Sequence, residues 1–341
     1  MSEPLVSVLI PCYNCADYIY ECVNSICEQD YLNLEVLVCD DGSTDNSLSV
    51  IRKLAESDLR IKVYENNENI GKIGTINRLI TETKGLYIAF LDSDDYVAKE
   101  KISLQVQFLQ LNSDFSLCGT GFARVDIKGN VFEKIYLPKN DKAIRQEVLS
   151  ATGMPVCCGS ILAVGEFVRK VIGYRDFFHD CSGEDVDFIS RLLDYGKGEN
   201  LEYIGYYYRY RPFSLTRRVF STVKQRHSHQ IISFLSEERW INNKKLDALD
   251  HNSAKLKDYI AELSKPYEDD PKLMSRKMAY DHALNGDFKH AFKMLYEGVT
   301  FNYKSASLKC FILVFVIILF PNNFLLKAKS IFGLKNIGSK L

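Results

Sequence analysis

The chain has almost no net charge, and its start does not resemble an export signal. Its 43 basic and 44 acidic residues leave a formal charge of -1, so no global field attracts nucleic acid. Residues 1–4 lead directly into an apolar strand pattern, without the long apolar stretch and cleavage site of a signal peptide. We therefore expect a cytoplasmic protein that does not bind nucleic acid.

Cysteines are present, but the spacing of a zinc site is not. The ten cysteines are scattered through apolar runs, and without an export signal we expect them to be reduced thiols. Cys12 and Cys15 form one Cys-x-x-Cys pair. No second such pair and no histidine pair completes it, which disfavours a structural zinc site.

Two glycine-rich phosphate-binding signatures are also missing. No Gly-x-Gly-x-x-Gly follows the first strand-like run, and no Gly-x-x-x-x-Gly-Lys-Ser/Thr occurs in the chain. Dinucleotide-dependent oxidoreductases and P-loop enzymes are therefore disfavoured. The first predicted loop instead contains Pro11 and Tyr13, and an aromatic ring in this place is suited to flank a nucleobase.

The first 120 residues alternate short β-branched runs with helix-period runs. The strand-like runs are 6–10, 34–39, 61–64 and 86–91, and the helix-like runs are 18–28, 48–56, 73–83 and 102–111. This alternation predicts an α/β fold with a Rossmann-like, mostly parallel sheet and helices on both faces. Ligands bind such sheets at the carboxyl ends of the strands. We therefore expect the chemistry in the loops 11–15, 39–46 and 91–96.

Beyond residue 120 the pattern changes. Alternating apolar positions on either side of Gly129 predict a β-hairpin at 121–137. From about residue 220 the sequence is helical and charged, and Pro266 and Pro271 are predicted to break helices. We expect an α/β domain at 1–219 and a helical region at 220–304, with a helical hairpin at 280–297, followed by an apolar and basic tail at 305–341.

The tail contains an apolar run that is too short to span a bilayer. Residues 310–320 are eleven consecutive apolar residues, whereas a spanning helix needs about 20. Four lysines follow the run: Lys327, Lys329, Lys335 and Lys340. We expect this segment to lie on the cytoplasmic face of the membrane with its lysines at the headgroups. The alternative is a helix buried in the core.

Acidic residues follow two of the predicted strands. Asp92, Asp94 and Asp95 come directly after the run 86–91, and their carboxylates repel one another unless a cation or protons neutralise them. Mg²⁺ or Mn²⁺ resolves the repulsion and usually adds phosphate oxygens to one or two carboxylates. A metal site with a diphosphate partner is therefore predicted, and an acidic turn on a solvated surface is the alternative.

Asp40 and Asp41 stand at the exit of the run 34–39. Carboxylates at this position can accept hydrogen bonds from a base or a ribose. Gly42 permits a tight turn there, and Ser43 or Thr44 can cap the helix that follows. Helix capping alone does not explain two acids at the strand exit.

Together these loops resemble the family 2 glycosyltransferases with the GT-A fold. The matching segments are 6–14 (VSVLIPCYN), 38–45 (VCDDGSTD), 69–71 (NIG) with Asn77, 85–95 (GLYIAFLDSDD) and 183–191 (GEDVDFISR). The resemblance covers about residues 4–215. It implies that Asp41 contacts the nucleobase, that Asp92 contacts the ribose and the metal, and that Asp94 binds the metal with support from Asp95.

The same resemblance implies the remaining roles. Asp185 is the expected catalytic base, with Glu184 beside it, and the alternative is that both acids only stabilise the start of a helix. Arg209 and Arg217 lie in a segment similar to the family's mobile segment and suit diphosphate recognition. Many members carry an arginine where this chain has Ile76. Lys72 or Arg78 is the expected substitute.

The activity implied by the resemblance is inverting, metal-dependent transfer of a sugar. The donor is a nucleotide diphosphate sugar, expected to be UDP-linked, and the acceptor is a hydroxyl of a glycan or of a lipid-linked sugar. A nucleotidyltransferase is one alternative, although it would normally carry a glycine-rich phosphate loop where Pro11 and Tyr13 stand. A catalytically inactive binding protein is the other, although the acidic residues are all present.

Overall fold

The computed structural model describes residues 3–210, 219–240, 246–251, 253–285 and 287–298. The chain divides into two compact units, Met1–Pro212 with Ile232–Asp247, and Phe213–Ile231 with Ala248–Leu341. The expected three-part division at 219 and 304 remains a prediction. Arg217 and the tail at 305–341 lie outside the described residues.

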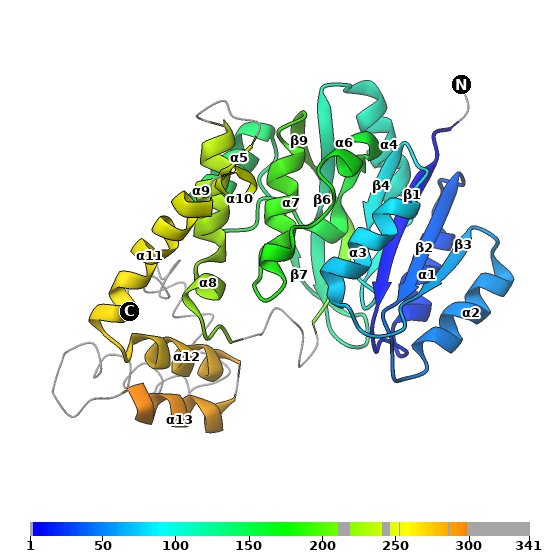
Figure 1. The fold of residues 1–341 in the computed structure, drawn as a ribbon. Coiled ribbons are helices and arrows are strands. Elements are labelled where there is room, and N and C mark those ends of the chain that lie inside the picture. The colour runs from blue at the N-terminus through cyan, green and yellow to red at the C-terminus, as the bar shows by residue number, and fades with distance from the viewer. Residues whose placement is uncertain (1–2, 211–218, 241–245, 252, 286, 299–341) are drawn as a thin grey trace. The chain divides into compact units, whose positions relative to one another are not determined.

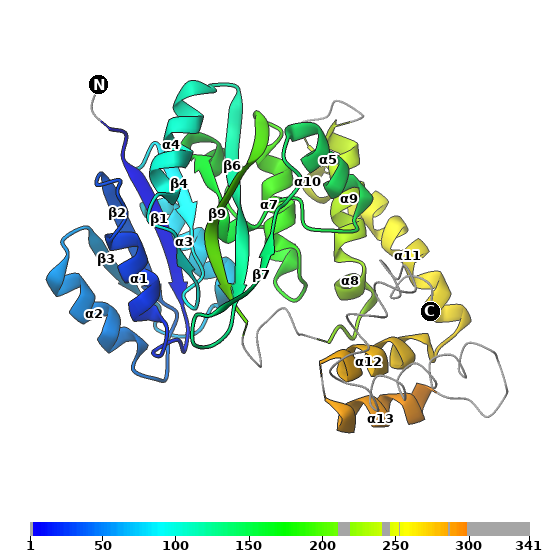
Figure 2. The ribbon, with the colours of Figure 1, turned by 180° about the vertical axis from the view of Figure 1, so that it is seen from behind.

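Within the described part of the first unit, nine strands form one mixed sheet (Figures 1 and 2). The order is β3-β2-β1-β4-β8-β6-β9-β5, and β7 pairs with β6. The strands are β1 (Val6–Cys12), β2 (Leu34–Asp40), β3 (Ile61–Glu65), β4 (Tyr87–Phe90), β5 (Tyr96–Val97), β6 (Phe115–Val125), β7 (Val131–Ile135), β8 (Leu162–Val164) and β9 (Lys197–Arg209). Strands β1 to β4 are mutually parallel where they pair. The predicted α/β fold class is confirmed.

Helices cover both faces of this sheet because its central strands are apolar on both sides. Every residue of β2 and β4 is buried, as expected for parallel strands between two helical layers. Helices α3 and α6 lie on the face seen in Figure 1, and α1 and α4 on the face seen in Figure 2. The helices of this part are α1 (Ile19–Cys27), α2 (Ser47–Ser57), α3 (Gly71–Glu82), α4 (Lys101–Leu111), α5 (Asp141–Ser150), α6 (Gly165–Lys170) and α7 (Glu184–Leu192), with short 3-10 turns at Cys158–Ser160 and Asp176–Phe178.

The predicted hairpin around Gly129 is present as the antiparallel pair β6 and β7. Gly129 has a φ of 85°, a left-handed conformation that glycine adopts at little cost. Its backbone N–H donates to the carbonyl of Asp126 at 3.0 Å. The turn chemistry read from the sequence therefore sets this connection.

The described part of the second unit is helical. It contains α8 (Val223–Arg226), the first residues of α9 (Ser228–Trp240), α10 (Ala248–His251), α11 (Ser253–Asp269), α12 (Leu273–Leu284) and α13 (Phe288–Gly298). Helices α12 and α13 form the helical hairpin expected at 280–297 (Figure 1). None of the described helices has the length and apolar character needed to cross a membrane.

The predicted break at Pro266 is wrong, whereas the one at Pro271 is correct. Pro266 lies inside α11, which continues to Asp269. A proline removes one N–H donor and crowds the preceding turn, but only one further turn of helix follows here. The carbonyl of Pro266 accepts from the N–H of Asp270 at 3.2 Å, so that last turn still closes.

One buried charge in the first unit gives a stability prediction. Lys101 begins α4 and is only 1% exposed, and burial lowers the pKa of its ammonium to about 8. Because the unfolded chain holds this proton up to about pH 10.5, the contribution of Lys101 to stability should rise with pH from about 8 to 10.5. At pH 7 the buried charge costs roughly 3 kcal/mol by the same linkage.

We therefore expect Lys101→Met to raise the free energy of unfolding by about 1–3 kcal/mol at pH 7. The gain of the variant over the parent should shrink as the pH rises from about 8 to 10.5. Urea unfolding across this pH range measures both effects, with Lys99→Met as the control because Lys99 is exposed. A Lys101→Met protein less stable than the parent at pH 7 would contradict the assignment.

Candidate active site

The loops after β1 and β2 are bound to each other at the carboxyl edge of the sheet. Cys12 and Asp40 are register partners where the two strands end. Beyond them, the N–H of Asn14 donates to Ser43 Oγ at 3.0 Å, and the N–H of Thr44 donates to Asn14 Oδ1 at 2.8 Å. Pro11 lies at the end of β1 and Tyr13 is 44% exposed beside it. The two predicted nucleobase contacts of the first loop therefore stand next to the predicted acids of the second.

Asp41 is engaged by the protein itself. Its side chain is buried and accepts from Asn66 Nδ2 at 2.7 Å and from the N–H groups of Ile70 and Gly71 at 3.0 and 2.9 Å. The carboxylate thus holds the loop that leads into α3. Gly42 beside it has a φ of 69°, and a Cβ there would lie 2.8 Å from the carbonyl carbon of Glu68, so this loop approaches closely only because residue 42 is glycine.

Asp40 differs from its neighbour. It is 3% exposed, and its Oδ2 accepts from the N–H of Ser43 at 3.0 Å. Its Oδ1 is buried without a hydrogen-bond partner in the described structure. A buried carboxylate oxygen without a donor is costly, so Asp40 has an acceptor that the described structure leaves unused.

The acidic loop after β4 has one buried and two partly exposed carboxylates. Asp92 Oδ1 lies 2.7 Å from Lys72 Nζ, and each side chain is about a third exposed (34% and 31%). Asp94 is half-buried. Asp95 is 2% exposed and is bound by β9 through the Arg209 N–H at 2.7 Å and the Tyr206 hydroxyl.

The environment of Asp95 gives it a supporting role. Burial, together with Asp94 and Asp92, raises the pKa of its carboxyl well above the usual range. Both of its oxygens face donors from β9. Among the three predicted metal ligands, Asp92 and Asp94 are therefore better placed to bind a metal. Asp95 instead holds the loop against β9.

Arg209 is buried rather than directed to solvent, with 2% of its surface exposed. Its guanidinium donates to the carbonyl of Asp94 at 3.0 Å and forms an ion pair with Glu21. It also lies over the rings of Tyr18 and Tyr96, 5.1 and 5.5 Å from their centroids. Arg209 therefore ties the acidic loop to α1, a contact that the local sequence does not indicate because Glu21 and Arg209 are far apart in the chain.

Of the two expected substitutes for the missing arginine, Lys72 reaches the acidic loop and Arg78 does not. Lys72 follows the first residue of α3 and pairs with Asp92. Arg78 donates to the carbonyl of Glu65 at 2.7 Å and lies over the Tyr64 ring. Of these two candidates, Lys72 is therefore the one that pairs with a predicted metal ligand.

The predicted catalytic acids begin α7, directly after Gly183, whose φ is 97°. Asp185 Oδ1 accepts from the N–H of Val186 at 2.8 Å. Burial and the charge of Asp185 raise the pKa of Glu184 to about 7, and Lys72 partly opposes this shift. Lys72 thus acts on both Asp92 and Glu184, which brings the start of α7 and the acidic loop into one electrostatic site.

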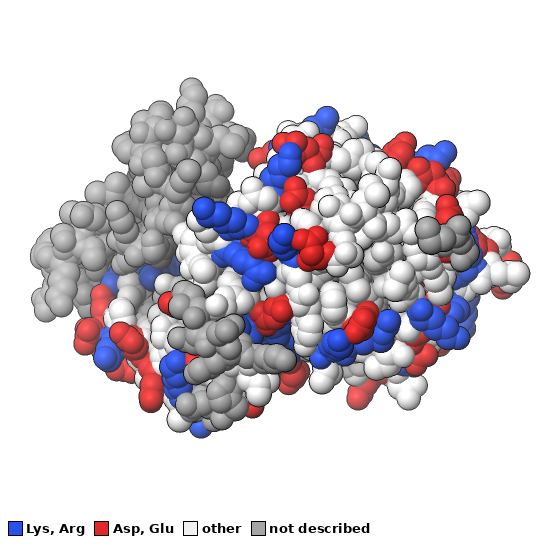
Figure 3. Space-filling view, turned by 90° about the horizontal axis from the view of Figure 1, so that it is seen from above, with Lys and Arg blue, Asp and Glu red and all other residues white. Residues whose placement is uncertain are grey.

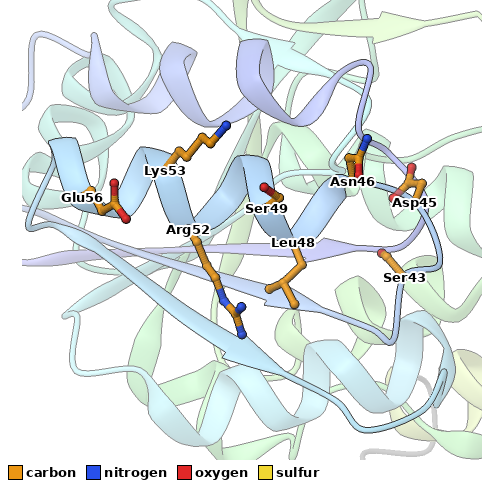
Figure 4. A pocket seen from close by; sticks show the side chains of 8 residues that line it. All are labelled: Ser43, Asp45, Asn46, Leu48, Ser49, Arg52, Lys53 and Glu56. Carbon is orange, nitrogen blue, oxygen red and sulfur yellow. The ribbon is translucent and has the colours of Figure 1, made fainter.

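A surface depression lies on α2 and is separate from these acids (Figure 4). Its lining residues are Ser43, Asp45, Asn46, Leu48, Ser49, Arg52, Lys53 and Glu56. It contains none of the predicted site residues. On the face shown in Figure 3, acidic and basic side chains of the described residues are interspersed, as the net charge suggests.

Comparisons with known proteins identify the family of this chain. The family model described as glycosyl transferase family 2 matches residues 7–165. EpsE of Bacillus subtilis (strain 168), named as a putative glycosyltransferase, is 33% identical over 223 residues, which are 64% of this chain and 78% of EpsE. The UDP-Glc:alpha-D-GlcNAc-diphosphoundecaprenol beta-1,3-glucosyltransferase WfaP of Escherichia coli is 45% identical over 111 residues, 33% of this chain and 43% of WfaP.

A solved structure shares the fold. The mannosyltransferase PcManGT from Pyrobaculum calidifontis, in complex with GDP-Man and Mn²⁺, superposes with a TM-score of 0.54 at 17% identity. The match covers 98% of this chain and 86% of that one. Because the matched part of WfaP is less than half of its length, its substrates do not transfer to this chain directly. The match to most of EpsE and the GT-A fold show that this chain belongs to glycosyl transferase family 2.

Proposed function

We propose that this chain is an inverting glycosyltransferase that moves a sugar from a UDP-linked donor to a hydroxyl of a glycan or lipid-linked acceptor. The observation that carries the proposal is Lys72, which pairs with Asp92 at 2.7 Å and also shifts the pKa of Glu184. A metal-type acidic loop and a pair of candidate bases therefore share one site. The similarity to WfaP, which is named as a UDP-Glc-dependent glucosyltransferase acting on a diphosphoundecaprenol-linked sugar, supports the donor and acceptor classes.

Asp92 and Asp94 would hold Mg²⁺ or Mn²⁺, because hard cations prefer carboxylate oxygens and complete their shell with phosphate and water. When bound, the metal would neutralise the charge that develops on the departing diphosphate. Lys72 can release Asp92 and turn to the same phosphates. The Mn²⁺ in the PcManGT complex supports a divalent cofactor.

The nucleotide side of the site uses the first two loops. Asp40 Oδ1, buried and without a donor, would accept the base N–H of uracil. We propose Asp40 for this contact in place of Asp41, because the Asp41 oxygens accept from Asn66, Ile70 and Gly71. Tyr13 would flank the base, with Pro11 shaping the strand end beneath it.

The reaction is a single displacement at the anomeric carbon. Asp185 takes the proton of the acceptor hydroxyl, the oxygen bonds to the anomeric carbon, and the bond to the diphosphate breaks with its electrons on the leaving oxygen. One displacement inverts the configuration. Glu184 stands beside Asp185 at the start of α7.

Incubation with a panel of nucleotide sugars tests the proposal. We expect nucleotide diphosphate release that requires Mg²⁺ or Mn²⁺, is fastest with a UDP-sugar, and accelerates when a lipid-linked sugar acceptor is added. Release of pyrophosphate from a nucleoside triphosphate and a sugar phosphate would instead indicate the nucleotidyltransferase. Tight UDP-sugar binding without turnover would indicate an inactive binding protein.

The raised pKa of Glu184 predicts a pH dependence. The Glu184 carboxyl loses its proton near pH 7, which adds a negative charge beside the proposed base. We expect kcat/KM to rise several-fold, up to about tenfold, between pH 6 and 8, and Glu184→Gln to flatten this rise. Glu56→Gln, a change on α2, is the control. A rise that persists in Glu184→Gln would assign the titration to another group.

The buried Arg209 predicts an effect on the metal rather than on the donor. Arg209→Lys keeps the charge but not the planar fork that reaches the Asp94 carbonyl and Glu21. We expect the Mn²⁺ concentration for half-maximal activity to rise about tenfold, with a smaller change in the KM of the donor. Arg124→Lys, an exposed pair with Glu133, is the control. A change in the KM of the donor alone would contradict this role and would support the direct contact between Arg209 and the donor that the sequence predicts.

We also propose a peripheral location at the cytoplasmic membrane face, through the tail at 305–341. The support is the sequence, with its eleven apolar residues at 310–320 and the lysines that follow. Co-sedimentation of the full chain with anionic liposomes should exceed that of a chain ending at residue 305. Equal sedimentation of the full chain and the shortened chain would contradict this location.

A further inference from the structure

Two histidines and one aspartate converge at the connection between α12 and α13. His282 lies in the last turn of α12, Asp287 directly precedes α13, and His290 lies in its first turn. One ligand atom from each of the three lies within 4.8 Å of the others. We propose that these residues bind one transition-metal ion of the zinc class, at a site distinct in sequence and chemistry from the acidic loop after β4.

Two of the three distances between the ligand atoms are close to the spacing that a small metal ion requires. Asp287 Oδ2 lies 3.1 Å from His282 Nδ1 and 2.8 Å from His290 Nδ1. Tetrahedral bonds of 2.0–2.1 Å place neighbouring ligand atoms about 3.3 Å apart. Small side-chain movements therefore suffice to admit the ion between three atoms that now face one another.

The two rings are held in a common orientation. Their centroids lie 5.3 Å apart and their planes differ by 26°, so they stack with both Nδ1 atoms toward the same carboxylate. Without a metal, each Nδ1 carries a proton and donates to Asp287. With a metal, both nitrogens and Oδ2 present lone pairs to the cation, a change that requires only the neutral imidazole with its proton on Nε2.

Asp287 can serve the ion and the helix at the same time. Its Oδ1 accepts from the N–H of His290 at 3.3 Å, as a residue at the start of a helix does. Its own N–H donates to the carbonyl of His282 at 2.9 Å. Oδ2 is the oxygen shared by both imidazoles, so metal binding leaves the cap of α13 intact.

The hairpin has a small apolar core, which gives a bound ion a structural role. Its core cluster consists of Ala279, Ala283, Ala291 and Leu295, with Tyr280 and Met294 partly buried against it. Alanine buries little apolar surface, and hydrophobic stabilisation scales with that surface. Small units with weak cores are commonly stabilised by a metal or a disulfide, and a metal at His282, Asp287 and His290 would join the two helices at their connection.

The ligand types select the ion. Imidazole nitrogens with one carboxylate suit Zn²⁺, Co²⁺ or Ni²⁺, whereas Mg²⁺ and Mn²⁺ prefer oxygen ligands. The exposed His290 ring, with 55% of its side chain accessible, leaves room for water as the fourth ligand. The metal site at His282, Asp287 and His290 therefore does not depend on the proposed glycosyltransferase activity. It uses a different class of metal and different residues.

Metal titration of the full chain tests the proposal. The protein is stripped with a chelator and kept in saturating Mg²⁺, so that carboxylate sites are occupied, and Zn²⁺ binding is measured by calorimetry. We expect one Zn²⁺ per chain. His282→Ala and His290→Gln should each weaken its binding about tenfold or more, and His229→Ala, a histidine elsewhere in the second unit, should not. Co²⁺ should give the visible absorption of a tetrahedral site in the parent and not in the two variants.

His290→Gln keeps the assay informative if His282→Ala fails to fold, because the His290 side chain is mostly exposed. Zn²⁺ should also raise the melting temperature of the parent and of His229→Ala, and leave that of His290→Gln unchanged. Absence of Zn²⁺ binding to the parent, or equal binding by the parent and His290→Gln, would overturn the site.

Discussion

Asp94→Asn is expected to lower kcat by about a thousandfold or more while the protein remains folded. Asparagine has nearly the same shape as aspartate but lacks the charge that a hard cation requires. Asp94 is half-buried at the edge of the sheet and outside the apolar core. Its backbone carbonyl, which accepts from Arg209, is unchanged by the substitution, so the loop should keep its position.

Donor turnover across a range of Mn²⁺ concentrations measures this effect, and urea unfolding confirms that stability is retained. Asp114→Asn, which removes an exposed pair with Lys197, is the matched control and should behave like the parent. Near-normal turnover of Asp94→Asn at saturating Mn²⁺ would show that Asp94 does not bind the metal.

Asp185→Asn should lower kcat by about 10²–10⁴-fold. An asparagine amide cannot take the proton of the acceptor hydroxyl, while the nucleotide contacts at the opposite loops are unchanged. The KM for the donor and the affinity for UDP should therefore stay close to those of the parent. Steady-state transfer to a lipid-linked acceptor and calorimetric UDP binding give the two quantities.

The comparison with Glu184→Gln distinguishes loss of the catalytic base from loss of a negative charge at the start of α7. Both substitutions remove one charge at the start of α7, but only Asp185 is assigned the proton transfer. Glu184→Gln should lose no more than about tenfold in kcat/KM at pH 8. If the two variants lose activity equally, or if Glu184→Gln is the more impaired, Asp185 is not the base.

The sequence predicts the sheet and its functional edge well because both depend on local pattern. Strands β1, β2 and β4 are short apolar runs, and their positions in the chain alternate with helices α1, α2 and α3. Parallel connection then places the loops after β1, β2 and β4 on one edge. Motifs at 11–14, 40–45 and 92–95 could therefore be assigned to a common site before any side chain was placed.

The roles of the individual residues within that site depend on contacts with residues that are distant in the chain. Asp40 and Asp41 are neighbours in sequence, but only Asp41 meets the N–H groups of Ile70 and Gly71. Arg209 reaches Glu21 across 188 positions of sequence. No periodicity or short motif reports such pairings, so the sequence identifies these residue types without determining which oxygen or guanidinium remains available to a ligand.

A crystal structure of the chain with UDP and Mn²⁺ tests the central claim most directly. We predict the metal between the diphosphate and the carboxylates of Asp92 and Asp94, with Lys72 released from Asp92 toward the phosphates. The uracil N–H should lie within hydrogen-bond distance of Asp40 Oδ1, and Asp185 should face the phosphate side of the site. Nucleotide bound elsewhere on the chain, or metal bound without Asp92 and Asp94, would contradict the proposed mechanism.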